Sequence, residues 1–108
     1  MKVPAFLLRR LYVRGSLRST VDGFEFQLRN RLGSGYANQL VPLSLDGQEL
    51  DLACSSFVID GVQTAFEAVS SEMPFTLAMN KTTTITYSGG KIEPGAHKVS
   101  MGFEVAGL

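Results

Sequence analysis

The segment FEFQLRNRL, residues 24–32, alternates apolar and polar side chains with a period of two. Its apolar face holds Phe24, Phe26, Leu28 and Leu32, and its polar face holds Glu25, Gln27, Arg29 and Arg31. Successive side chains of a β-strand point to opposite faces of the sheet, so this pattern predicts a strand with one buried face. The chain must therefore build at least one sheet that covers a core on one side.

Further segments also read as strands. They lie at residues 38–50, 56–60, 81–88 and 95–105. Asp-Gly pairs at residues 22–23, 46–47 and 60–61 suit two-residue hairpin loops, whose central residues need positive φ. Short strands joined by hairpins predict an all-β fold. We expect a single domain over residues 1–108, an antiparallel immunoglobulin-like β-sandwich of about seven to nine strands.

The same alternation predicts which side chains fill the space between the two sheets. We expect this core to hold Phe24, Phe26, Leu28, Val41, Leu43, Leu45, Ile85, Val99, Met101 and Phe103. Pro42 interrupts one of the runs. A proline has no amide proton for the ladder, so that strand should lie at an edge or carry a bulge.

One segment, residues 64–73, has helical features. Thr64 and Glu67 fit a capping box, and Phe66, Val69 and Met73 follow helical spacing. We expect at most one short helix there.

Composition narrows the class of protein. Of the 108 residues, 44% are hydrophobic and 19% charged, as in a globular domain. The single cysteine, Cys54, allows no intrachain disulfide. Arg9 and Arg10 break the apolar opening, and no run of about 18 apolar residues follows, so we expect neither a signal peptide nor a membrane association. Cytoplasmic residence is the resulting expectation.

Charge is distributed unevenly along the chain. Residues 1–31 hold seven of the ten basic side chains and two acids, whereas residues 32–108 hold three basic side chains and eight acids. The opposite charges could pair inside the fold, or the basic part could dock an acidic protein or a second copy. We do not expect nucleic-acid binding, because aromatic residues are not interleaved with the arginines. The expected interface residues are Arg9, Arg10, Arg14, Arg18 and Tyr36.

His97 is the only histidine of the chain. Pro94 and Gly95 suit the central positions of a type II turn, after which a strand should begin with His97 at its first inward position. A catalytic histidine would need a positioned nucleophile or carboxylate, which the sequence does not supply. We therefore expect a structural role. Cys54, in LACSSF, is expected to pack in the core, although a nucleophilic role stays open.

No catalytic residue, metal site or cofactor is expected. Zinc sites need several His or Cys ligands, and the chain has one of each. Asp46, Glu49 and Asp51 lack the spacing of an EF-hand and are interpreted as a solvated hairpin face.

The order of segments resembles the small β-sandwich subunit of bacterial C-glycoside deglycosidases. The segments that carry the resemblance are GFEFQLRN, VPLSLDGQEL, SFVIDGVQTAFEAV and GGKIEPGAHKVSMGF, which together span most of residues 21–104. The resemblance implies an accessory subunit without catalytic residues. Its partner would be a metal-dependent (β/α)-barrel subunit that eliminates the sugar from an oxidised C-glycoside, a carbon–carbon lyase-type reaction.

Other readings remain open from the residues alone. The chain could be a free-standing β-sandwich that binds a carbohydrate or small ligand, or a homo-oligomeric protein without such a partner. An enzyme acting alone would need a pocket that joins His97 or Cys54 to carboxylates.

Overall fold

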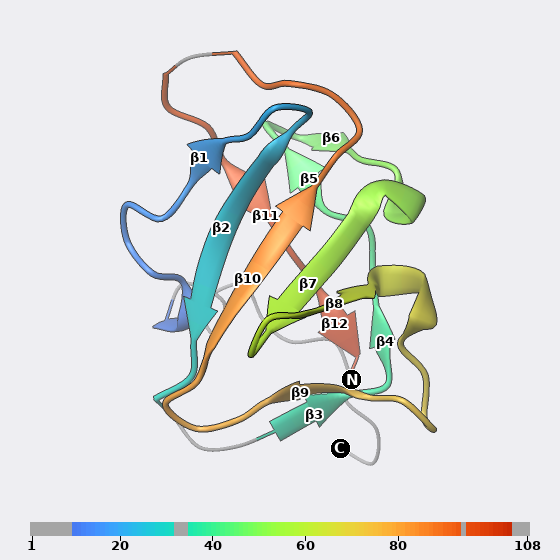
Figure 1. Cartoon of the computed structure of the whole chain (residues 1–108). Coiled ribbons are helices and arrows are strands. Elements are labelled where there is room, and N and C mark those ends of the chain that lie inside the picture. The colour runs from blue at the N-terminus through green and yellow to red at the C-terminus, as the bar shows by residue number, and fades with distance from the viewer. Residues whose placement is uncertain (1–9, 32–34, 94, 105–108) are drawn as a thin grey trace.

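The computed structural model describes residues 10–31, 35–93 and 95–104. Its largest unit is a five-stranded antiparallel sheet in the order β1-β2-β10-β7-β8 (Figure 1). The strands are β1 (Arg18–Ser19), β2 (Phe24–Arg29), β10 (Thr82–Tyr87), β7 (Ser55–Ile59) and β8 (Val62–Ala65). The predicted strand at residues 24–32 is present as β2, which lies between β1 and β10 and ends at Arg29, while Leu32 lies outside the described residues.

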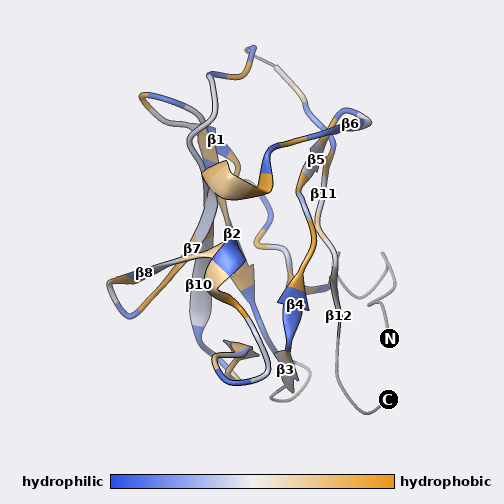
Figure 2. Cartoon of the chain, turned by 90° about the vertical axis from the view of Figure 1, so that its right-hand side faces the viewer, coloured by the Kyte–Doolittle hydropathy of each residue, from blue (hydrophilic) through white to orange (hydrophobic). Residues whose placement is uncertain are grey.

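Shorter strands pair in three smaller antiparallel units. These are β11 (Val99–Ser100) with β5 (Ser44–Leu45) and β6 (Gln48–Glu49), β12 (Phe103–Glu104) with β4 (Gln39–Leu40), and β3 (Gly35–Ala37) with β9 (Phe75–Leu77). Figure 2 shows the five-stranded sheet edge-on. The strands β4, β5, β11 and β12 form a second layer that faces it. The described chain is thus mostly β, built from antiparallel sheets in a compact globule.

The core confirms the alternation of β2. Phe24, Phe26 and Leu28 are 0%, 2% and 0% exposed, whereas Glu25 and Gln27 between them are half-buried and Arg29 is exposed. Ile85 on β10 lies opposite Phe26 in the register and is also fully buried. Leu43 and Met101, which the sequence also placed in the core, are buried from the side of the second layer.

The alternation predicted for residues 38–50 fails around Pro42. The segment splits into β4 and β5, and the residues between them do not pair as a strand. Leu40 is buried in place of Val41, which is only half-buried. Because the break resets the parity, a single inward face could not run through the whole segment.

The sequence also placed Leu45, Val99 and Phe103 in the core. Leu45 and Val99 are partly buried against the core rather than enclosed by it. The side chain of Phe103 lies outside the described residues, although its backbone pairs with Leu40.

The short helix expected within residues 64–73 is present as a single 3-10 turn, but its predicted start is wrong. Thr64 belongs to β8, and a three-residue 3-10 helix, η2, covers Phe66–Ala68. Its N-cap is Ala65, which has no side-chain capping bond, so the Thr64–Glu67 capping box does not form. Phe66 is 1% exposed, and burial of this one side chain decides the local conformation over helical spacing.

Two of the Asp-Gly pairs form the predicted hairpin turns. Asp46 and Gly47 have φ of 52° and 86°, and Asp60 and Gly61 have φ of 51° and 81°. Both central residues are therefore left-handed, as a type I′ turn requires. Gly23 has another role: a Cβ atom there would lie 1.8 Å from the carbonyl oxygen of Tyr87, so only glycine allows this close approach.

Candidate functional site: a basic face with two hollows

The segment before β1 covers the edge of β2 that β10 leaves open. Tyr12 forms an isolated antiparallel bridge with Leu28, and the Val13 amide donates to the carbonyl oxygen of Gln27 at 2.9 Å. The amide of Gln27 in turn donates to the hydroxyl oxygen of Ser16 at 2.9 Å. These bonds hold the polypeptide between residues 12 and 16 against β2.

This attachment brings arginines from two parts of the chain around one cavity of about 410 Å³. We call it the arginine hollow. Its lining includes Arg10, Arg14, Arg29, Arg31, Gln27 and Thr82. All four arginines are exposed, and none of them takes part in the ion pairs formed among the described residues. In the described part of the chain, no Asp or Glu lines the hollow, so its charge is uniformly positive.

A second cavity, of about 430 Å³, shares Tyr12 and Arg14 with the first. We call it the histidine hollow, because His97 and Lys98 line it together with the apolar side chains Leu17, Phe26 and Val99. The ring of Tyr12 lies 6.1 Å from the ring of Phe26, tilted by 51°. The two hollows therefore share the segment that contains Tyr12 and Arg14, although Phe26 belongs to the buried face of β2 and Gln27 and Arg29 to its outer face.

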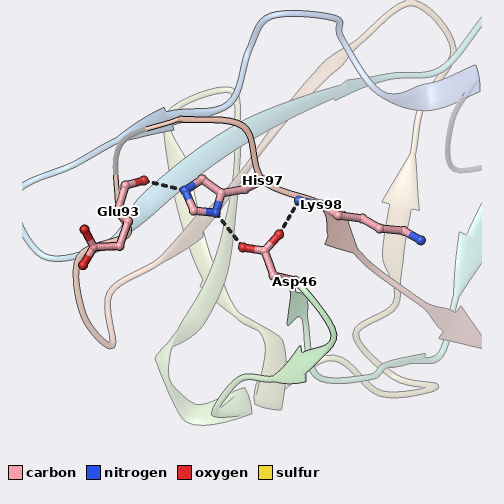
Figure 3. A network of polar contacts seen from close by, with 4 residues as sticks. All are labelled: Asp46, Glu93, His97 and Lys98. Atoms are coloured by element: carbon pink, nitrogen blue, oxygen red, sulfur yellow. Dashed lines mark hydrogen bonds and ion pairs between the residues drawn. The ribbon is translucent and has the colours of Figure 1, made fainter.

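His97 is held at both ring nitrogens (Figure 3). Its Nδ1 donates to Oδ2 of Asp46 at 2.6 Å, and its Nε2 donates to the carbonyl oxygen of Glu93. The backbone amide of Lys98 donates to the other carboxylate oxygen, Oδ1 of Asp46, at 2.8 Å. The amide of Asp46 donates back to the carbonyl oxygen of Lys98 at 2.7 Å. Asp46 thus joins the β5–β6 turn to the chain that leads into β11.

Both ring nitrogens of His97 face acceptors, so both need a proton and the imidazolium form fits this site best. The hydrogen bond to Asp46 and then the one to the Glu93 carbonyl raise the pKa of His97 above its ordinary value. The Lys98 amide and then His97 lower the pKa of Asp46. A histidine with both nitrogens occupied has none free to accept a proton, so the geometry is that of a brace and not of a general base.

The position of His97 differs from the sequence prediction. β11 begins at Val99, two residues later, so the interpretation of His97 as the first residue of a strand was wrong. Its imidazole is bound by polar partners, with 10% of its side chain exposed. Gly95 has φ of 113°, as the predicted turn needs, while Pro94 lies outside the described residues.

The residues predicted for an interface lie in several places of the fold. Arg10 and Arg14 line the arginine hollow, and Arg9 lies outside the described residues. Arg18 pairs with Glu25 at 2.9 Å, which compensates its charge. Tyr36 is 56% exposed on β3, which pairs with β9 and not with the large sheet.

Sequence reasoning did not name Arg29 and Arg31 as site residues, although the signal was present. The alternation that buries Phe24, Phe26 and Leu28 places Arg29 on the outer face of β2, and Arg31 follows with the same parity. Both also belong to the basic part of the chain. The sequence does not show that residues 12–13 pair with β2. This pairing brings Arg10 and Arg14 beside Arg29 and Arg31.

The other candidate residues stand apart from these hollows. Cys54 ends a short 3-10 helix, η1 (Leu52–Cys54), and is half-buried. Asp51 caps that helix, its carboxylate accepting from the amide of Ala53 at 3.0 Å. Among the described residues, no three His, Cys, Asp or Glu side chains are placed to hold a metal ion. The described helices also include none that is long and apolar enough to cross a membrane.

The comparison with protein families decides what the chain is related to. A family model described as the hydroxymethylglutaryl-CoA reductase N-terminal domain matches residues 7–108. The chain belongs to this family. No curated protein matches the chain. The chain is accordingly the N-terminal domain of a hydroxymethylglutaryl-CoA reductase-like protein.

This membership corrects the resemblance to the small subunit of C-glycoside deglycosidases, which was wrong, and with it the predicted role as accessory subunit of a metal-dependent barrel. The physical reason lies in the segment that carried most weight. Gly95 and His97 meet local needs of the fold, a positive φ and a brace to Asp46. Any domain that attaches a loop to a hairpin in this way can use the same pattern, so it does not identify a function.

Proposed function

We propose that this N-terminal domain of a hydroxymethylglutaryl-CoA reductase-like protein has a binding role, and that the arginine hollow is where it binds an anionic group. The observation that carries the proposal is the convergence of Arg10, Arg14, Arg29 and Arg31 on one cavity with no acidic neighbour among the described residues. Guanidinium groups match carboxylates and phosphates with paired hydrogen bonds.

The like charges of the arginines support this proposal energetically. Side chains of one sign repel one another, and a hollow with low-dielectric walls concentrates the field that they produce. An anion that enters would relieve that repulsion and gain charge-assisted hydrogen bonds. Arg18, on the same edge of the sheet, already has Glu25 as its partner and does not offer such a site.

His97 supports a binding role over bond-making chemistry in this domain. Its two ring nitrogens are bound to Asp46 and to the carbonyl of Glu93, and its ring holds two segments of the chain together. This brace fixes one wall of the histidine hollow, which shares Tyr12 and Arg14 with the arginine hollow.

Fluorescence anisotropy of a labelled hexaglutamate peptide tests the proposal. The wild-type chain should bind the peptide with an affinity that falls as salt rises, and the variant Arg29→Gln/Arg31→Gln should bind at least about tenfold more weakly, because each lost charged hydrogen bond costs 1–3 kcal/mol or so. Arg18→Gln is a control that removes one positive charge outside the hollow, whereas the double variant removes two. Equal weakening by both changes would mean that the hollow has no special role.

Self-association is a second candidate. It is favoured by the position of β1, a two-residue strand at the outer edge of the five-stranded sheet. Sheet edges are common places for one chain to meet another. A second copy would bring its acidic regions to the basic edge.

We also propose that the two layers of strands form an immunoglobulin-like sandwich. Two facing layers of antiparallel strands support an immunoglobulin-like sandwich. A crystal structure of the chain tests this, because it would give the strand order over all residues.

A further inference from the structure

We propose that the anion bound in the arginine hollow is a phosphate group, free or carried on a small organic molecule. This inference rests on the proposed function, since it names the chemistry of the ligand for the same site. It is drawn from the number, origin and surroundings of the arginines.

The arginines reach the hollow from two separate segments. Arg10 and Arg14 come from the chain before β1, while Arg29 ends β2 and Arg31 follows it. The bridge between Tyr12 and Leu28 holds these segments side by side. Guanidinium groups placed around a cavity can donate to one anion from several directions, which is what a tetrahedral group with three free oxygens accepts.

Charge also favours phosphate over a single carboxylate. A phosphate ester carries a charge of about −1.5 to −2 near neutral pH, whereas a carboxylate carries one negative charge. Four arginines without acidic neighbours in the described chain are better balanced by the larger charge. Gln27 and Thr82 line the same hollow and provide neutral hydrogen-bonding groups beside the guanidinium groups.

The volume of the site suits a small molecule. A cavity of about 410 Å³ falls in the range of small-ligand sites, roughly 300–1,000 Å³. The histidine hollow shares Tyr12 and Arg14 with it but is lined by Phe26, from the buried face of β2, whereas Gln27 and Arg29 belong to the outer face, so the phosphate site is the arginine hollow alone.

Isothermal titration calorimetry of the 108-residue chain with sodium pyrophosphate tests the inference. Saturable binding at one site is expected at about 0.15 M salt, where the screening length is about 8 Å. The variant Arg29→Gln/Arg31→Gln should weaken it at least about tenfold, and Arg18→Gln should change it less than about threefold. Circular dichroism of each variant checks the fold. If the double variant does not fold, Arg10→Gln/Arg14→Gln removes charge from the other segment.

Titration with adenosine diphosphate distinguishes the two sources of the phosphate group. Tighter binding than pyrophosphate would indicate a phosphate carried on an organic molecule. Equal binding would indicate the free anion, and either outcome supports a phosphate site.

The hexaglutamate peptide separates failure of this inference from failure of the proposed function. Binding of the peptide without saturable binding of pyrophosphate would overturn the phosphate inference and leave an anion-binding domain. Binding of neither probe would overturn both. Pyrophosphate binding that Arg29→Gln/Arg31→Gln and Arg18→Gln reduce equally would also overturn the inference, because the arginine hollow would then have no special part in it.

Discussion

Nδ1 of His97 lies 2.6 Å from Oδ2 of Asp46, and the contact joins residues 51 positions apart in the chain. It connects the β5–β6 turn with the segment that enters β11 (Figure 3). Because the imidazolium form donates at both nitrogens, the strength of this connection depends on pH.

The first prediction concerns stability against pH. The pKa of His97 is raised in the folded state, so its stabilisation is fully present below the unfolded value of about 6.5 and is lost as pH rises through the folded value. Urea denaturation should therefore show that the wild type has a smaller free energy of unfolding at pH 8.5 than at pH 5.5. In a His97→Gln variant, the free energy of unfolding should fall less between these two pH values. A wild type equally stable at both pH values would contradict the brace.

The second prediction isolates the charge of Asp46. In Asp46→Asn the turn can keep its left-handed backbone, because asparagine tolerates positive φ. Proton NMR of the only histidine should show a raised pKa for His97 in the wild type and a lower pKa in Asp46→Asn. The carboxylate itself has a lowered pKa, so its contribution is present above its usual value of about 3.9 and is lost as pH falls through the lower folded value. An unchanged His97 pKa in the variant would remove Asp46 as the cause.

The third prediction concerns the core. Phe26 is 2% exposed, lies opposite Ile85 and contacts the ring of Tyr12. Phe26→Ala should destabilise the domain by about 3–5 kcal/mol in chemical denaturation, through lost burial and the cavity left behind. Val62 is 66% exposed, and Val62→Ala should stay within about 0.5 kcal/mol. Similar losses for both variants would mean that β2 does not form the core.

The fourth prediction concerns self-association. If the basic edge docks a second copy, sedimentation velocity should show a dimer at tens of micromolar protein, weakened by salt. Arg9→Glu/Arg10→Glu should dissociate it. A monomeric wild type, or an equally tight variant dimer, would leave the uneven charge without a role in oligomerisation.

Local alternation predicted the central strands well, because burial of one face sets the parity of a strand. Phe24, Phe26 and Leu28 on β2, with Ile85 on β10, are buried as expected. Alternation does not predict where a strand stops. Around Pro42 the backbone leaves the sheet, and the parity changes with it. The helical spacing of residues 64–73 yields only the 3-10 turn at Phe66–Ala68, since burial of Phe66 outweighs that spacing.

The candidate site was harder to predict because it depends on contacts between distant segments. Nothing in the spacing of Asp46 and His97 indicates that they meet. Arg10 and Arg14 were expected to form an interface with Arg18, yet Arg18 pairs with Glu25 and the hollow is completed by Arg29 and Arg31. The uneven charge predicted a basic surface, but only the pairing of Tyr12 with Leu28 shows which arginines share it.

Amide chemical-shift mapping by NMR tests the central claim most directly. Pyrophosphate added to the ¹⁵N-labelled chain should shift the amides of residues 10–14, Gln27, Arg29, Arg31 and Thr82, which surround the arginine hollow. The amides of β8, at the opposite edge of the five-stranded sheet, should stay in place. Saturable shifts confined to the hollow are the result that we predict. Shifts spread over all exposed basic residues, Lys91 included, would contradict a binding site there.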